Sequence, residues 1–273
     1  MDRLLRVGGF PEPFLENDDQ YYQRWKKTHL DIVLRQDLID LESVIDYKSI
    51  ETLIELLRRN VGLLVSYASL ARDLQRDAKT VKRWLSILQN LYIFFPVYPW
   101  NRNIVRAILK MPKFCFFDTG QVIGDVGVKL ENLVAYALLK ELHRLEDETG
   151  VDSTLHYIRN KEGKEIDFAV NINEQITHLI EVKSTDESLS KNFCTFCSIE
   201  GAKKNQLVKS KRREKTYPGG EEVRKPVQCV IPSLPSLYAA ASFAMYSHSF
   251  RSIECRGRTD RQSISVERRL LIL

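Results

Sequence analysis

The sequence lacks a run of about 18 apolar residues, and no secretory signal pattern follows Met1. It also lacks the motif G-x-x-x-x-G-K-[ST], the glycine-rich loop whose backbone holds the phosphates of ATP. From these absences we expect a cytoplasmic protein that contacts no membrane. We also expect this chain not to use or hydrolyse ATP.

Cysteine is scarce, with five residues in 273. An odd number in an apparently intracellular chain argues against a disulfide framework. Cys194 and Cys197 form one C-x-x-C, but a zinc site needs a second cysteine pair or a histidine pair at matching spacing, and neither is present. We interpret the pair as buried or incidental, with metal or redox use as the alternative.

Lysine is absent beyond Lys225, where serine and arginine dominate. This change in composition predicts an atypical tail over residues 233–273 that is disordered or foreign, for example the product of a changed reading frame. The alternative is an ordinary helix over Leu237–Tyr246 with a loose end. The basic segment Lys203–Lys225, which contains Pro218, Gly219 and Gly220, is predicted to be a loop that could hold phosphates.

The remaining composition is ordinary for a globular protein, with 44% hydrophobic and 28% charged residues. The net charge of +5 permits nucleic-acid binding without requiring it. A chain of this length can form one large core or two modest ones.

The most informative stretch is Gly163–Ser184, where charged residues interrupt two strand-like runs. In the first run apolar residues alternate with Glu165 and Asp167, so one face is apolar and the other holds two carboxylates. In the second run Glu181 and Lys183 are two residues apart and therefore lie on the same side of the strand. Pairing of the runs as a hairpin would bring Asp167, Glu181 and Lys183 together.

These residue types suit phosphodiester hydrolysis. Carboxylates are suitable ligands for Mg²⁺, which neutralises charge on the phosphoryl oxygens. A lysine on the same face can assist the attacking water. The alternative is a surface hairpin whose charges merely prevent edge-to-edge aggregation.

The spacing of Asp167, Glu181 and Lys183 resembles the PD-(D/E)xK nuclease superfamily, with Ile166 where the motif name has proline. The resemblance implies that Asp167 and Glu181 hold Mg²⁺ and that Lys183 positions the hydrolytic water. It also implies a further acid on a preceding helix, and Glu131 occupies that place. Glu165 would be an acid next to the metal ligands that does not itself bind the metal.

Helical periodicity predicts several helices in the first hundred residues, after which a strand pair is expected within Leu91–Tyr98. The predicted helices are Tyr21–Leu34, Asp37–Asp46, Ile50–Arg59, Ser69–Gln75 and Thr80–Asn90.

The last two helices, the turn between them and the strands have the outline of a winged helix-turn-helix. The second of these helices would expose Lys79, Lys82 and Arg83, which could contact DNA phosphates. The alternative is a protein-packing domain whose basic residues form a solvated helix face.

Further along, the pattern predicts a buried strand over Lys113–Phe117, a long helix over Glu131–Leu145 and a strand over Thr154–Asn160. Asp118 follows the first strand. We interpret it as a turn-capping residue, with a ligand role as the alternative.

The order of motifs resembles the C-terminal portion of prokaryotic AAA-type ATPases that carry the domain of unknown function 4143. The resemblance covers about Val7 to Lys209 and rests on Gly8–Glu12 and on the motifs KFCFFDTG, LEN, HYIRN, Glu-x-Asp-Phe and Glu-Val-Lys.

The resemblance implies an α/β protein, in which a helical and winged-helix N-terminal domain precedes a restriction-endonuclease-like mixed sheet flanked by helices. The expected divisions are an ATPase remnant at 1–20, the helical and winged-helix domain at 21–110, the nuclease-like domain at 111–232, and the tail.

The implied function is a DNA-associated, nuclease-like protein, a candidate Mg²⁺-dependent phosphodiesterase from a truncated AAA-type ATPase. The alternative is a non-catalytic module that binds DNA or protein through the winged helix. A cognate ATPase chain is a further candidate partner.

Overall fold

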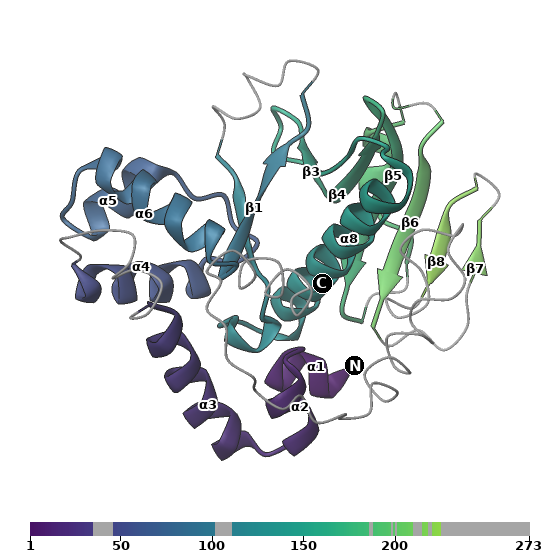
Figure 1. Cartoon of the computed structure of the whole chain (residues 1–273). Helices are drawn as coiled ribbons and strands as arrows, with labels where there is room; N and C mark the ends of the chain where they lie inside the picture. Colours follow the sequence, from purple (N-terminus) through teal and green to yellow (C-terminus); the bar gives the residue numbers. More distant parts are fainter. Residues whose placement is uncertain are drawn as a thin grey trace.

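The computed structural model describes residues 1–34, 46–101, 111–185, 188–197, 199, 201–209, 215–217 and 220–224. A helical N-terminal region precedes a mixed sheet flanked by helices, so the expected α/β class is confirmed (Figure 1). The tail at 233–273, its alternative helix, and the helix predicted for Asp37–Asp46 lie outside the described residues, apart from Asp46.

The N-terminal region consists of short helices that mostly begin at a side-chain cap. The first backbone N–H groups of a helix have no hydrogen-bond acceptor within the helix. In four helices a side chain at the N-cap accepts a hydrogen bond from one of them; these caps are Asp18, Asp46, Ser66 and Asp77. The helices are α1 (Asp2–Val7), α2 (Pro11–Glu16), α3 (Asp19–Ile32), α4 (Tyr47–Arg59), α5 (Tyr67–Asp73) and α6 (Ala78–Asn90).

The helices predicted in this region from α3 onward are confirmed where the structure describes them. In α4, Ile50, Leu53, Ile54 and Leu57 recur at helical spacing and are buried in a core shared with α5 and α6. Their burial therefore packs α4 together with α5 and α6.

The strand pair predicted within Leu91–Tyr98 is wrong, because that segment contains one strand. Helix α6 ends at Asn90 with Leu91 as its C-cap, and Tyr92 takes a positive φ of 54°, which leaves too few residues for two strands. Strand β1 (Phe94–Pro99) instead pairs antiparallel with β2 (Lys113–Phe116). The predicted strand at Lys113–Phe117 is thereby confirmed.

The described strands form one eight-stranded sheet in the order β2-β1-β3-β4-β5-β6-β8-β7. β4 is antiparallel to both β3 and β5, whereas β1–β3, β5–β6 and β6–β8 pair in parallel. The bounds are β3 (Ser153–Arg159), β4 (Glu165–Ile172), β5 (Gln175–Lys183), β6 (Lys203–Val208), β7 (Lys215–Thr216) and β8 (Glu222–Arg224).

These strands confirm the hairpin expected at Gly163–Ser184 and the strand expected near Thr154–Asn160. The loop predicted for Lys203–Lys225 is wrong where β6, β7 and β8 form. In β6 the four residues from Asn205 to Val208 are buried, and the strand pairs in parallel with β5. Tertiary burial therefore overrides the basic composition of that segment.

Helix α8 (Val126–Thr149) packs against the sheet through Val134, Leu138 and Leu142 (Figure 1). It begins five residues before the predicted start, because Asp125 caps it by accepting a hydrogen bond from Val128 N. Glu131 therefore lies in the second turn, rather than at the opening of the helix.

Asp118 caps the turn after β2, as predicted. Its Oδ1 accepts a hydrogen bond from Gly120 N at 3.1 Å, at the start of the short 3₁₀ helix η2 (Thr119–Gln121). Its Oδ2 accepts a second from the hydroxyl of Tyr22 at 3.0 Å, which ties α3 to this turn.

Asn132, the asparagine of the LEN motif, connects α8 to the end of β2. Its Oδ1 accepts a hydrogen bond from Phe116 N at 2.6 Å, and its Nδ2 donates to Phe116 O at 2.9 Å and to Thr119 Oγ1 at 3.1 Å. The side chain is fully buried. The asparagine of the LEN motif therefore has a structural role, which is separate from the role expected for Glu131.

Asn132→Ala is expected to lower the free energy of unfolding by about 2–4 kcal/mol, because buried backbone groups of Phe116 lose their partner. Urea denaturation measures the change. Asn90→Ala, at an exposed position in the last turn of α6, is the control and should change it by less than about 1 kcal/mol. Equal effects in the two variants would contradict the structural role of Asn132.

Candidate functional site

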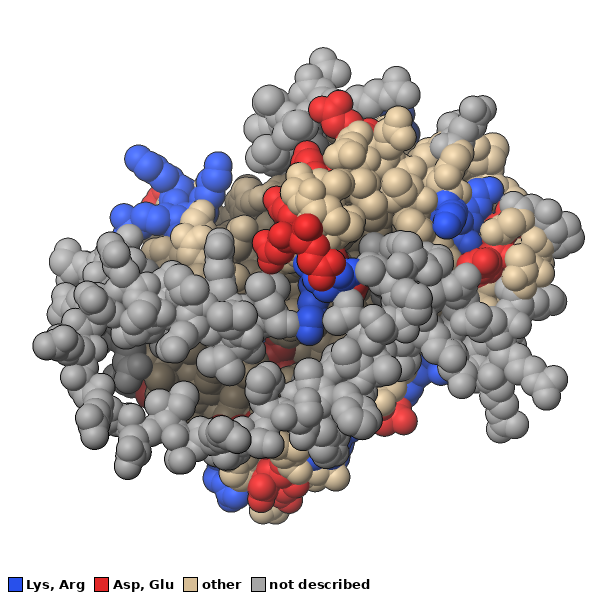
Figure 2. Space-filling view, turned by 45° about the vertical axis from the view of Figure 1, so that its right-hand side comes forward, with Lys and Arg blue, Asp and Glu red and all other residues tan. Residues whose placement is uncertain are grey.

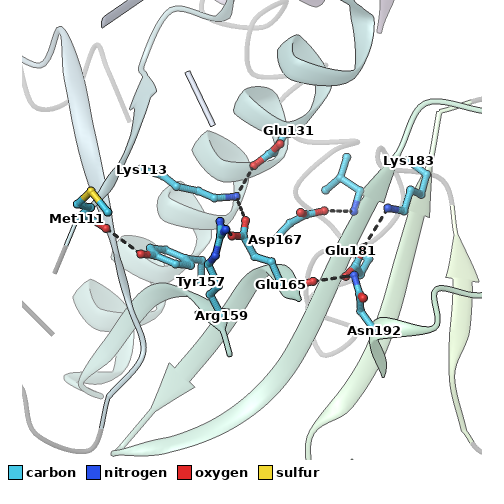
Figure 3. A network of polar contacts seen from close by, with 11 residues as sticks. Met111, Lys113, Glu131, Tyr157, Arg159, Glu165, Asp167, Glu181, Lys183 and Asn192 are labelled. Carbon is cyan, nitrogen blue, oxygen red and sulfur yellow. Dashed lines mark hydrogen bonds and ion pairs between the residues drawn. The ribbon is translucent and has the colours of Figure 1, made fainter. Parts of the chain in front are cut away.

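The three residues of the sequence motif lie on adjacent strands. Phe168 of β4 pairs with Ile180 of β5, which places Asp167 and Glu181 beside each other at the next position. Oδ2 of Asp167 accepts a hydrogen bond from Val182 N at 2.8 Å. This hydrogen bond from the backbone of β5 fixes the position of the Asp167 side chain (Figure 3).

Glu181 is buried, with 1% of its surface exposed. Its carboxylate forms an ion pair with one side chain and accepts a hydrogen bond from another. Lys183 Nζ lies 3.2 Å from its Oε2, and Asn192 Nδ2 donates to its Oε1 at 3.0 Å. Asn192 belongs to the short helix α9 (Asn192–Thr195) and also donates to the backbone oxygen of Glu165. Lys183 retains 37% side-chain exposure, so its ammonium group can reach both Glu181 and solvent.

A second group of charges surrounds Lys113, the first residue of β2. Its ammonium group lies 2.9 Å from Glu131 Oε1 and 2.5 Å from Glu165 Oε1, with only 3% of the side chain exposed. Arg159 Nη1 lies 3.2 Å from the other oxygen of Glu165. Figure 3 shows this group next to Asp167.

The ring of Tyr157 lies on one side of the charged group around Lys113. The ammonium group of Lys113 lies 5.7 Å from the centroid of the Tyr157 ring. The Tyr157 hydroxyl donates a hydrogen bond to Met111 O at 2.7 Å, which fixes the ring beside the lysine. We define the carboxylate site as Glu131, Glu165, Asp167 and Glu181 with their partners Lys113, Arg159, Lys183 and Asn192.

Burial is the largest cause of the altered pKa values in the carboxylate site. It raises the pKa of Glu131 to about 7, against the opposing charge of Lys113. It also raises the pKa of Asp167, where Lys113 and Val182 N oppose it. The pKa of Glu181 is raised by burial and then by the charge of Asp167, so these two carboxylates interact directly.

For Lys113, nearby charges affect the pKa more strongly than burial does. Burial alone would lower its pKa, but the negative charges of Glu131, Glu165 and Asp167 outweigh burial and raise it above the ordinary lysine value. Lys113 therefore stays charged. The carboxylate site contains four carboxylates and three basic side chains, and so favours one additional positive charge.

Half-buried Asp167 and buried Glu181 are oxygen donors of the kind that suit Mg²⁺, which often binds through one or two carboxylates. Glu131 and Glu165 are engaged by Lys113 instead. Among the described residues, no group of three or more His, Cys, Asp and Glu side chains is arranged to hold a metal ion. A metal ion here would therefore have two protein carboxylates as ligands, Asp167 and Glu181.

The free energy of unfolding is expected to fall by about 1–3 kcal/mol as the pH rises from 4.5 to 7, because of Glu131. Its pKa is higher in the folded state, so folding favours the protonated form, and this contribution is complete below the unfolded pKa and is lost at higher pH. Urea denaturation of the wild type and Glu131→Gln across this range measures it. An equally steep pH dependence in the variant would contradict the assignment to Glu131.

The candidate nucleic-acid contacts Lys79, Lys82 and Arg83 are exposed on α6, in another part of the fold (Figure 1). On the face in Figure 2, the described Lys and Arg side chains form several separate groups with Asp and Glu among them. That face therefore carries mixed charges rather than one basic surface.

Sequence reasoning missed Lys113, Arg159 and Asn192. A signal existed only for Lys113, as a charged residue at the start of an otherwise apolar strand KFCF. Arg159 and Asn192 lie in segments whose composition is unremarkable, and only the folded sheet brings them to the carboxylates.

Two family models match the chain. A domain of unknown function (DUF8612) matches residues 1–125, and a second (DUF4143) matches residues 126–232, which supports the resemblance to the 4143 family over that part. Among the described helices, none is both long and apolar enough to cross a membrane.

Two curated relatives are uncharacterised proteins of Mycobacterium bovis and Mycobacterium tuberculosis. Each is 26% identical over 243 residues, which cover 86% of this chain and 52% of the relative. The chain therefore spans about half the length of the curated relatives it matches. No solved structure gave a significant match.

Proposed function

We propose that this protein is a DNA-associated, metal-dependent phosphodiesterase with a nuclease-like core. One observation carries the proposal. Half-buried Asp167 and buried Glu181 lie side by side on paired strands, and the ammonium group of Lys183 lies 3.2 Å from Glu181. A cluster of interacting carboxylates with raised pKa values next to a lysine is typical of catalytic sites.

In this proposal Asp167 and Glu181 hold Mg²⁺. The metal would neutralise charge on the phosphoryl oxygens and make bound water more acidic. Val182 N fixes the position of Asp167, and Asn192 fixes Glu181, so both carboxylates are oriented before a substrate arrives. Burial raises the pKa of both carboxylates in spite of the nearby lysines, so a divalent cation bound between them would stabilise their charged forms.

Lys183 is the residue best placed to act on the attacking water. Its ammonium group contacts Glu181 and is partly exposed, so it can donate a hydrogen bond to water or phosphate at the edge of the site. Glu131 and Glu165 have an indirect role, since both hold Lys113. Lys113 supplies a fixed positive charge near Asp167.

Calorimetric titration with Mn²⁺ and Mg²⁺ tests the proposal. The wild type should bind a divalent cation, and the double variant Asp167→Asn with Glu181→Gln should lose that binding heat. Asp152→Asn with Glu162→Gln removes the same charges from exposed positions and is the matched control. Wild-type protein that is folded and releases no binding heat would rule the proposal out.

A second candidate is a non-catalytic module that binds DNA or a partner protein, such as a cognate ATPase chain. The observation that favours it is the arrangement of α5 and α6 followed by the antiparallel pair of β1 and β2, with three basic side chains exposed on α6. This arrangement has the element order of a winged helix-turn-helix. Such a module would need no metal.

Fluorescence anisotropy with a labelled DNA duplex distinguishes the candidates. Binding that is weakened by Lys79→Gln, Lys82→Gln and Arg83→Gln together, without any cleavage in Mn²⁺ or Mg²⁺, would support the binding module. A triple variant at exposed Lys161, Lys164 and Lys203 is the control for loss of overall charge. Cleavage that requires Asp167 would support the phosphodiesterase.

A further inference from the structure

A second candidate site lies away from the carboxylate site, between the N-terminal helices and the start of α8. It is a cavity of about 410 Å³, which is within the usual range of about 300–1,000 Å³ for small-molecule pockets. Helices α1 and α3 form one side, and η2 with the first turns of α8 forms the other (Figure 1). We call it the basic pocket; its lining includes Arg6, Asp19, Gln23, Lys26, Gln121 and Lys129.

Positive charge predominates in this lining, where three basic side chains face one acid. The acid, Asp19, pairs with Arg6, which also donates to Asn17 at 2.6 Å. Within the described part of the chain, no acidic side chain forms an ion pair with Lys26 or Lys129. Two ammonium groups thus remain for a ligand.

The surroundings of Lys26 disfavour its positive charge. Its pKa is lowered, first by burial and then by the positive charge of Arg58, while Asp118 and Glu55 oppose the change. Lys129 lowers it further. Asp118 itself is engaged by Tyr22 and Gly120, so an anion in the pocket would relieve repulsion that the protein leaves in place.

One wall of the pocket is closely packed around buried Tyr22. The ammonium group of Lys26 lies 5.5 Å from the centroid of the Tyr22 ring, whose hydroxyl is hydrogen-bonded to Asp118. Tyr22 packs so closely on Gly120 that an added Cβ at Gly120 would lie 2.2 Å from its hydroxyl oxygen. This wall is therefore in place before a ligand binds, which lowers the entropy cost of binding.

We propose that the basic pocket binds a small phosphate-bearing anion, with Lys26 and Lys129 as its charged contacts. Lysine ammonium groups bind phosphate as compact positive charges. Gln23 is an uncharged side chain in the same lining that can donate a further hydrogen bond. The proposal stands independently of the phosphodiesterase, since the two sites share no residue.

Calorimetric titration of the full chain with orthophosphate, pyrophosphate and ADP, in buffer with a chelator that removes divalent cations, tests this. Binding should weaken at least tenfold in Lys26→Gln with Lys129→Gln. The control Lys27→Gln with Lys140→Gln removes the same charge from the same two helices outside the pocket lining and should change the affinity less than twofold.

Equal affinities for pyrophosphate and ADP would support recognition of the phosphates alone, and tighter binding of ADP would support a nucleotide. The proposal is overturned if the folded wild type binds none of the three anions. It is also overturned if the control variant weakens binding as much as the pocket variant, because the attraction would then be general electrostatics.

Discussion

Asp167→Asn is expected to lower Mg²⁺-dependent cleavage of DNA at least about a hundredfold and, at the same time, to stabilise the protein. The loss of activity follows from the proposed role of Asp167 as a metal ligand, since an amide oxygen binds Mg²⁺ more weakly than a carboxylate. The gain in stability follows from burial, which raises the pKa of Asp167 and so disfavours its charged form.

The stability gain depends on pH. Because the pKa of Asp167 is raised by folding, its ionisation costs stability above the unfolded pKa, and asparagine avoids that cost. Asparagine can still accept the hydrogen bond from Val182 N. The variant should therefore unfold at a higher urea concentration than the wild type at pH 8, with a smaller difference at pH 4.

Asp152→Asn, at an exposed position before β3, is the matched control and should change neither property. Unchanged cleavage in Asp167→Asn would remove this residue from the catalytic site. Lost cleavage together with lower stability at pH 8 would indicate a structural role, because the variant would then fail through unfolding.

Lys113→Met is expected to lower the free energy of unfolding by about 3–5 kcal/mol at pH 8. The substitution removes the cation that lies 2.9 Å from Glu131 and 2.5 Å from Glu165. It leaves partly buried Glu131 without a basic partner and Glu165 with Arg159 alone. Methionine keeps a similar length and apolar character, so the lost charge is the main change. Urea denaturation gives the magnitude.

A compensating variant separates charge from packing. Lys113→Met combined with Glu131→Gln and Glu165→Gln should recover most of the lost stability, because neutral amides cost less to bury than unpaired carboxylates. The destabilisation of Lys113→Met alone should shrink at acidic pH, where Glu131 is protonated.

Lys164→Met removes an exposed lysine from the turn before β4 and should change the free energy of unfolding by less than about 1 kcal/mol. A Lys113→Met destabilisation that is the same at both pH values, and is not reduced in the triple variant, would show that packing rather than charge determines the effect.

The sequence predicted most of the local structure that depends on periodicity and caps. The helix at Ile50–Arg59 and the hairpin at Gly163–Ser184 form as expected, because apolar spacing in each matches one buried face. In the hairpin, the alternation of apolar and charged residues also predicted that Asp167 and Glu181 lie on adjacent strands. This part of the site follows from short-range pattern alone.

The rest depends on long-range pairing that no local pattern encodes. Lys113 reaches Glu131 and Glu165 only because β2 and β1 extend the sheet beside β3. The strand at Lys203–Val208 was missed for a related reason: its polar residues are buried by strand pairing with β5, so their polarity does not indicate a loop. The structural role of Asn132 likewise requires the end of β2 to lie against α8.

The border between the two matched families, after residue 125, does not separate two folding units. Strand β1, before the border, pairs in parallel with β3, after it, and the ion pairs of Lys113 with Glu131 and Glu165 cross the same border. A chain cut there would expose a sheet edge on one fragment and buried acids without their cation on the other. The two matched segments therefore share one sheet, and separating them is expected to lower the solubility as well as the stability of both fragments.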